Sequence, residues 1–381
     1  MATTATIAQN LKFNADGKFK IAQFTDIHYN GSKASKAALK VLENVLTQER
    51  PDLIVLSGDI IYGTPAKKNL LDVLNCISKY NIPFVYEFGN HDSEQGLTNR
   101  ELYNIARGVK NNILPDLSNA KELDYVVKIK ERKGNNDAAV LYCLDSHSYP
   151  KGFPKDKSHG TYAWLTFDQV SWYRQQAQAL KDANKGKTLP ALAFFHIALP
   201  EFTYATENQH VAMIGTRREQ CCGPEFNSGM FTAMMESEDV MGIFVGHDHD
   251  NDYTTLYHNI VLGYGRYSGG NTEYNHLKAG ARIFVLEEGQ RRFSTYIREW
   301  EFVGTVDGWE NGIASCQQRG KWSLGDTLEA LCPDGRSIPL TPEWIENEAG
   351  ERVDSTPHAM EKYTMPTPEL PPMSLLRRKT V

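Results

Sequence analysis

The feature that most constrains the fold is an alternation of short apolar runs and amphipathic stretches near the start of the chain. The expected strands cover residues 20–25, 53–56 and 82–88, and the expected helices cover residues 36–50 and 65–77. Each helical stretch carries apolar side chains at helical spacing, and the run at 53–56 is apolar throughout, as in a strand buried on both faces. This order predicts parallel strands joined by right-handed crossovers.

The remaining pattern predicts a second sheet and a chain of three segments. Further strands are expected at 125–129, 140–144, 191–195 and 241–245, with a helix at 167–182 that Thr166 caps. After Asp252 the expected strands shorten to 253–257, 260–264, 281–286 and 292–300, which indicates a second, mainly antiparallel sheet packed on the first. Residues 1–18 are interpreted as an N-terminal extension, 19–303 as the main domain and 304–381 as a C-terminal extension. Prolines at 366, 368, 371 and 372 predict that its end is extended or disordered.

Composition excludes several classes of protein. The chain has 41 basic and 47 acidic residues, a balance of −6, and no basic block, which argues against nucleic acid as a partner. No apolar run reaches the roughly 18 residues of a membrane span. The six cysteines match no zinc or redox motif, so we expect buried free thiols. If the protein is exported, bridges within Cys221–Cys222 or between Cys316 and Cys332 are the alternative.

The N-terminus bears on localisation. Residues 5–9 resemble the small-residue end of a secretory signal, although no basic or apolar region precedes them. We therefore favour a periplasmic or secreted protein over a cytoplasmic one, with an ordinary disordered terminus as the alternative.

Polar clusters follow the apolar strands at the points where the strands end. They are Asp26-Ile27-His28, Gly58-Asp59, Gly89-Asn90-His91-Asp92, His196 and Gly246-His247-Asp248-His249. Because sites in such sheets gather at the carboxyl edge, we expect these side chains to meet there. Imidazole, carboxylate and amide ligands suit Zn, Fe and Mn. Seven such ligands are too many for one ion but enough for two, the arrangement that clamps the oxygens of an in-line displacement at phosphorus.

In this order and at these strand ends, the five clusters resemble the motifs of the calcineurin-like metallophosphoesterases, over about residues 19–300. Residues 193–196, 227–229 and 246–252 look closest to the purple-acid-phosphatase-like branch. The resemblance implies an α/β metallophosphatase fold, a four-layer αββα sandwich in which helices flank two packed mixed β-sheets.

The resemblance also implies roles for individual residues. It assigns the first metal to Asp26, His28, Asp59 and His249, and the second to Asp59, Asn90, His196 and His247, with Asp59 bridging. His91 would contact phosphate together with Asn90 and would protonate the leaving alkoxide. The nucleophile would be a metal-bridging hydroxide that attacks the phosphate ester in line. The metals would be Mn, Fe or Zn, with Mg or Ni as alternatives, and the substrate a small phosphorylated molecule, either a monoester or a diester.

The chain departs from the purple acid phosphatase pattern at one metal ligand. True purple acid phosphatases have a Gly-Asp-x-x-Tyr motif whose tyrosine binds ferric iron, and Tyr62 has that spacing. Because His28 would crowd the same metal, we favour His28 as the ligand and Tyr62 as a wall residue. Asp92 is expected to orient His91, and Asp250 or Asp252 to support the histidine pair, with simple turn roles equally plausible.

Arginines and one further loop are weaker candidates. Arg266 and Arg282 could grip a phosphate, but structural ion pairs are the preferred interpretation. The run Asp145–Ser148 follows a strand and is a candidate for the substrate side of the site, although a structural role is again the preferred interpretation.

Two other functions were weighed. A metallo-β-lactamase-type hydrolase requires Asp and His where this chain has Asn251 and Asp252, which excludes that class. A catalytically silent metal-binding protein on the same fold is the alternative to an enzyme. Silent members are expected to have lost a ligand or the acid, and every position is filled here.

Overall fold

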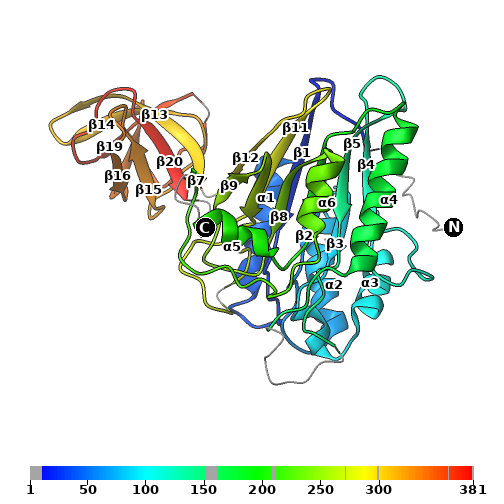
Figure 1. Cartoon of the computed structure of the whole chain (residues 1–381). Coiled ribbons are helices and arrows are strands. Elements are labelled where there is room, and N and C mark those ends of the chain that lie inside the picture. Colours follow the sequence, from blue (N-terminus) through cyan, green and yellow to red (C-terminus); the bar gives the residue numbers. More distant parts are fainter. Residues whose placement is uncertain are drawn as a thin grey trace. The chain divides into compact units, whose positions relative to one another are not determined.

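The computed structural model describes residues 11–151, 161–207, 212–270, 272–297, 300–358 and 360–379. The chain divides into two compact units, residues 1–297 and 298–381 (Figure 1). The signal-like residues 5–9 lie outside the described residues. Within the described part, none of the helices combines the length and the apolar character that a membrane span requires.

The first sheet contains the predicted β-α-β-α-β unit. Its strand order is β12-β11-β1-β2-β3. The parallel strands are β1 (Lys18–Phe24), β2 (Leu53–Ser57) and β3 (Phe84–Glu87), and the connecting helices are α1 (Lys36–Glu49) and α2 (Ala66–Ser78). Strand β11 (Arg282–Glu287) pairs antiparallel with β1, and β12 (Phe293–Ile297) pairs antiparallel with β11 at the edge of the sheet. The short 3-10 helix η1 (Asp92–Gln95) and helix α3 (Asn99–Arg107) follow β3.

The second sheet is mixed, and its strand order is β4-β5-β6-β8-β10-β9-β7. Its strands are β4 (Tyr125–Lys130), β5 (Asp137–Cys143), β6 (Ala191–Phe194), β7 (Met213–Ile214), β8 (Val240–Val245), β9 (Thr254–Tyr257) and β10 (Ile260–Tyr264). Strands β5, β6, β8 and β10 run parallel, so the expectation of a mainly antiparallel sheet was wrong. The strands near 281–286 and 292–300 were also assigned to this sheet, and they belong to the first one. Alternating apolar residues predict a strand but do not tell which sheet edge it joins.

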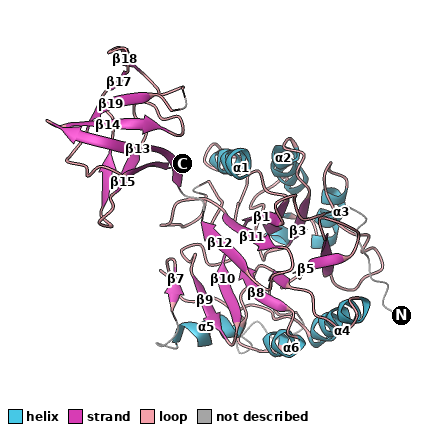
Figure 2. Cartoon of the chain, turned by 90° about the horizontal axis from the view of Figure 1, so that it is seen from above, coloured by secondary structure: helices cyan, strands magenta, loops and turns pink. Residues whose placement is uncertain are grey.

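The two sheets and two sets of helices form the four-layer αββα sandwich that the resemblance implied (Figure 2). Helices α1 to α3 cover the first sheet, whereas α4 (Phe167–Ala183), α5 (Pro200–Glu207) and α6 (Met230–Ser237) cover the second. Strand β6 is an example of a strand that is buried on both faces. Leu192 and Phe194 pack in the core between the sheets, and Ala191 and Ala193 pack in the core under the outer helices. This alternation explains the continuous apolar run in the sequence.

A carboxylic acid is buried at the end of β3. Glu87 accepts a hydrogen bond from the Tyr125 hydroxyl at 3.1 Å, and burial raises the pKa of Glu87 from its ordinary value of 4.5 to about 8. Between these values the folded chain keeps a proton that the unfolded chain has released. The contribution of Glu87 to the free energy of unfolding should therefore be fully present below pH 4.5 and fall by about 1.4 kcal/mol per pH unit as the pH rises to 8.

We expect Glu87→Gln to remove this contribution and so make the pH dependence of stability less steep, because the amide does not ionise. Urea unfolding at pH 5 and pH 8 should show that the variant gains stability relative to the wild type at the higher pH. Glu236→Gln, at an exposed position of α6, is the control and should keep the slope. An equal slope in wild type and Glu87→Gln would contradict the assignment.

The C-terminal unit is a single antiparallel sheet with the order β16-β15-β20-β13-β14-β19-β17-β18. Its strands are β13 (Trp300–Glu310), β14 (Ile313–Gln318), β15 (Leu328–Leu331), β16 (Ser337–Leu340), β17 (Ile345–Asn347), β18 (Arg352–Val353), β19 (Lys362–Pro366) and β20 (Leu375–Lys379). The unit has its own core around the fully buried Trp322. The expected boundary at 303/304 falls inside β13, and the end expected to be extended or disordered contains β19 and β20.

All six cysteines lie in the described residues and are free thiols. Four of them are buried as expected, but Cys221 is half-buried and Cys222 is exposed, so the expectation of buried thiols was wrong for this pair.

Candidate metal centre

The carboxyl ends of five strands bring the seven predicted ligands together. Asp26 and His28 follow β1, Asp59 follows β2, Asn90 follows β3, His196 follows β6, and His247 and His249 follow β8. All seven side chains are buried. These strands belong to both sheets, so the ligands meet where the carboxyl edges of the two sheets lie next to each other.

The side chains form two groups of possible metal ligands. Asp26, His28 and His249 form one group, and Asp59, His196 and His247 form the other, each with its ligand atoms within 4.8 Å of one another. The Asp59 carboxylate also links the groups. Its Oδ2 lies 3.1 Å from Nε2 of His196 and 3.7 Å from Nε2 of His28. This position between the groups is the one that a shared ligand needs.

Several polar atoms at this edge lack a partner. Within the part of the chain that the structure describes, Nε2 of His28, His196 and His247 and Oδ1 of Asn90 are buried and make no hydrogen bond. Buried polar atoms are normally satisfied, so an unsatisfied cluster calls for an explanation. A metal ion bound by these nitrogens and oxygens supplies one, and the donor set fits two such ions.

Hydrogen bonds to backbone carbonyls set the orientation of two of the histidine rings. Nδ1 of His196 lies 2.9 Å from the carbonyl of Ser57, and Nδ1 of His249 lies 2.9 Å from the carbonyl of Tyr274. A carbonyl only accepts, so each Nδ1 carries a proton, and in the neutral ring each Nε2 would offer its lone pair to a bound metal. This is the usual support for a metal-binding histidine.

The charges of the cluster are mutually stabilising. Burial would raise the pKa of Asp26, but His196 and His249 hold it well below its ordinary value. Burial would lower the pKa of His196, but Asp59 and Asp26 raise it to about 10. The pKa of His247 falls to about 3 because of burial and the nearby His196. Since ligands must be deprotonated, a bound cation would displace the proton of His196.

The backbone at these strand ends is left-handed, an arrangement uncommon for residues other than glycine. The φ angles are 53° at Asp26, 47° at His28, 51° at Asp59 and 77° at His247. Such residues persist only where the surroundings enforce the conformation, and they cluster at functional sites.

Two glycines of the motifs are explained by close packing. A Cβ atom at Gly89 would overlap the Asp59 carboxylate, and one at Gly246 would overlap the Thr25 hydroxyl. Glycine at these positions therefore makes room for the ligand side chains.

His91 lies beside the two groups and is held by a residue that the sequence interpretation missed. Its Nδ1 is 2.6 Å from Oε2 of Glu94, and its backbone N–H donates to Oδ1 of Asp59 at 2.8 Å. The expected partner, Asp92, instead accepts backbone N–H groups, including those of Asp59 and Gly89. Glu94 follows His91 by three residues in η1, a spacing that places two side chains on one face of a helical turn.

Other predicted residues have structural roles. Asp250 accepts hydrogen bonds from the backbone and ring of His276, and Asp252 pairs with Arg266. Arg282 donates to backbone carbonyls, including that of Tyr264. The preferred interpretation of both arginines as structural agrees with these contacts. The ring of Tyr62 packs on His28 and His91, with centroids 5.3 and 4.6 Å apart.

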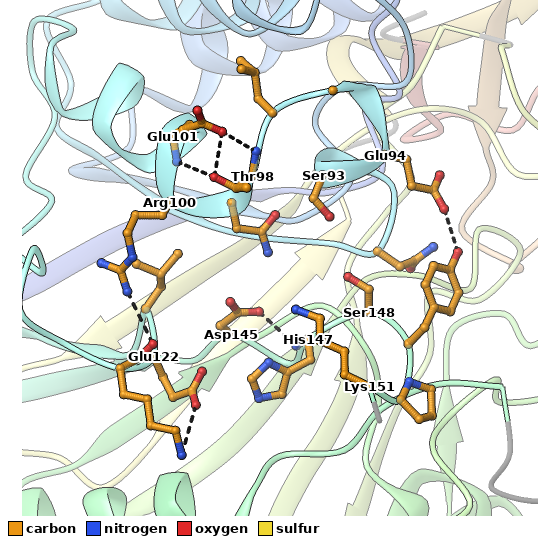
Figure 3. A pocket seen from close by; sticks show the side chains of 18 residues that line it. Ser93, Glu94, Thr98, Arg100, Glu101, Glu122, Asp145, His147, Ser148 and Lys151 are labelled. Carbon is orange, nitrogen blue, oxygen red and sulfur yellow. Dashed lines mark hydrogen bonds and ion pairs between the residues drawn. The ribbon is translucent and has the colours of Figure 1, made fainter. Parts of the chain in front are cut away.

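A cavity of about 670 Å³ adjoins the site (Figure 3). Asn90 and Glu94 belong to its lining, so it opens beside the second ligand group and the partner of His91. Tyr149, also in the lining, donates from its hydroxyl to Glu94 at 2.9 Å. The loop Asp145–Ser148, a candidate for the substrate side, lines the same cavity.

Comparison with protein-family models gives a match for each unit. Residues 19–251 match the model described as calcineurin-like phosphoesterase. Residues 298–377 match the model of the peptidase family U32 C-terminal domain.

Individual relatives cover most of the chain. Probable inactive purple acid phosphatase 14 of Arabidopsis thaliana is 31% identical over 362 residues, which cover 84% of this chain and 88% of that protein. Phosphatase DCR2 of Saccharomyces cerevisiae is 30% identical and covers 77% of this chain and 56% of that protein. The crystal structure of a dimetal phosphatase from Danio rerio is 15% identical, covers 73% of this chain and 98% of that chain, and superposes with a TM-score of 0.49.

Proposed function

The chain belongs to the calcineurin-like phosphoesterase family, and we propose that it hydrolyses small phosphate esters at a centre of two divalent or transition-metal ions. The observation that supports this most is the pair of ligand groups, with Asp59 between them and buried ring nitrogens that lack a partner. Mn, Fe and Zn suit these nitrogen and oxygen donors, and Mg or Ni are alternatives.

The metals would be held by the two sets already assigned, with Asn90 completing the second. When bound, such ions act as Lewis acids toward the phosphate and make a bound water nucleophilic near neutral pH. The chain itself contributes the rest of the chemistry. His91 is half-buried, and its Nδ1 is held by Glu94, so Nε2 of the protonated ring can donate a proton to the leaving alkoxide. The Asn90 side chain amide lies next to it and can contact the phosphate.

Catalytic silence is the second candidate function, because the Arabidopsis relative is named probable inactive. The name of this relative is the observation that favours catalytic silence in the present chain. In favour of activity, the ligand positions and His91 are all filled, and Glu94 holds His91.

An assay with two chromogenic esters tests the proposal. Protein reconstituted with Mn²⁺ is incubated with the mono- and bis-p-nitrophenyl phosphates, and metal-stripped protein is the blank. We expect p-nitrophenol release that depends on the metal, and the preferred ester tells a phosphomonoesterase from a phosphodiesterase. No release above the blank with Mn, Fe or Zn would favour the silent protein.

Replacement of Glu94 by Gln tests the role of His91. The carboxylate fixes Nδ1 of His91, so its loss should lower kcat for an alkyl phosphate by about tenfold to a hundredfold, a part of what a general acid contributes. The loss should be below about threefold for p-nitrophenyl phosphate, since p-nitrophenolate leaves without a proton. Glu207→Gln, at an exposed position of α5, is the control. Equal losses on the two esters would show that Glu94 acts otherwise.

A further inference from the structure

A cavity beside the metal centre has room for the alcohol part of a substrate. Its lining includes Asn90 from the ligand set and Glu94, the partner of His91, but not His91 itself. A group that leaves past Asn90 and Glu94 would enter this cavity. Its volume of about 670 Å³ is within the usual range for pockets that hold small molecules.

His147, at the exit of β5, lines this cavity, and its hydrogen bond defines which ring nitrogen can accept. The side-chain amide of Gln169 donates to Asp124 at 3.0 Å and to the carbonyl of Asp145 at 2.8 Å, so its orientation is fixed and its oxygen only accepts. That oxygen lies 2.8 Å from Nε2 of His147. Nε2 therefore carries the proton, and the neutral ring presents the Nδ1 lone pair.

The backbone holds His147 in the same unusual conformation as the ligands. Its φ is 62°, and its N–H donates to Oδ1 of Asp145 at 2.9 Å. Among the described residues Nδ1 has no hydrogen-bond partner. The ring is held by one hydrogen bond at Nε2 and the backbone by one at N–H, while Nδ1 stays available, an arrangement that suits binding better than packing.

The rest of the lining mixes donors and acceptors with apolar side chains, among them Leu97 and Leu123. His147 and Ser148 lie on the β5 side of the cavity, and Ser93 lies on the η1 side (Figure 3). Lys151 adds an ammonium group and Asp145 a carboxylate. A hydroxyl group both donates and accepts, so several hydroxyl groups match such a lining, whereas an alkyl chain would leave polar groups without partners.

We propose that this cavity binds the alcohol part of the phosphate ester and selects alcohols with several hydroxyl groups, such as polyols and sugars. In this arrangement Nδ1 of His147 accepts a hydrogen bond from one substrate hydroxyl. The inference rests on the proposed function, since it names the substrate class of that site.

Two esters that differ only in hydroxyl groups test the selection. The Mn²⁺-loaded enzyme should prefer glycerol 3-phosphate to n-propyl phosphate by about thirtyfold or more in kcat/KM, because a site built for hydroxyls rejects an analogue without them. His147→Asn, which tolerates a left-handed backbone, should reduce the preference to about threefold and keep kcat/KM for n-propyl phosphate within about twofold. His258→Asn replaces another left-handed histidine, on an exposed turn, and should change neither value.

A wild-type preference near unity, or one that His147→Asn leaves unchanged, would overturn the proposal. If His147→Asn hydrolyses neither ester, Ser148→Ala is measured instead. The proposal then requires that its preference for glycerol 3-phosphate falls at least about threefold below that of the wild type. If no ester is hydrolysed, the proposed function fails, and nitrogen NMR of the histidines decides on the cavity. A shift of the His147 Nδ1 resonance with glycerol 3-phosphate, but not with n-propyl phosphate, would support the inference, and equal responses would overturn it.

Discussion

Replacement of Asp59 by Asn is expected to lower kcat/KM for phosphate ester hydrolysis by at least about a thousandfold, which corresponds to about 4 kcal/mol of lost transition-state stabilisation. The carboxylate lies 3.1 Å from Nε2 of His196 and 3.7 Å from Nε2 of His28, between the two ligand groups. The amide keeps the volume and one oxygen but removes the negative charge that a shared ligand supplies to both cations. The remaining oxygen can still accept the N–H of His91, so the fold should persist.

The control for this substitution is Asp182→Asn, the same chemical change at an exposed position of α4. It should leave kcat/KM within about twofold, since surface changes have small effects. Circular dichroism and the thermal midpoint establish that Asp59→Asn is folded. Turnover by Asp59→Asn at the wild-type rate would contradict the two-metal mechanism.

Removal of metal is expected to lower the thermal midpoint of residues 1–297 by about 10 °C or more. Each ion stabilises the folded state by about 2.7 kcal/mol at a concentration a hundred times its dissociation constant. Two ions add about 5 kcal/mol, and in a domain of this size each kcal/mol shifts the midpoint by about 2–4 °C. The reason lies in the buried carboxylates and the ring nitrogens that have no partner.

Scanning calorimetry of chelator-treated protein, with and without added Mn²⁺, measures the shift. In Asp59→Asn, the shift of the thermal midpoint on adding Mn²⁺ should be much smaller, because the carboxylate charge between the two ligand groups is gone. His258→Asn, away from the ligand groups, should keep it. If Mn, Fe and Zn all leave the midpoint unchanged, the cluster does not bind these ions.

The sequence is informative about the site because the ligands follow apolar strands directly. Asp26 and Asp59 could be placed at one edge once the β-α-β pattern was recognised, since parallel strands end at the same edge. The partner of His91 could not be chosen in the same way. Asp92 is adjacent in sequence, but the turn of η1 directs it to backbone N–H groups and brings Glu94 to the ring.

The second unit was harder to predict. Its strands are short, and the prolines near its end were interpreted as a sign of an extended or disordered tail. Pro366 is the last residue of β19, and Pro368, Pro371 and Pro372 lie between β19 and β20. A proline at a strand end or in a loop is compatible with an ordered sheet, so proline content alone does not distinguish the two cases.

The left-handed backbone at Asp26, His28, Asp59 and His247 lowers the stability of the fold at the residues that the site requires. Each such residue costs about 1–3 kcal/mol, and together they weigh against a total stability of about 5–15 kcal/mol. Glycine at these positions would relieve the strain and remove the ligand at the same time. Engineering for heat resistance and selection for the site therefore act in opposite directions at these four residues, and improvements have to be sought elsewhere in the fold.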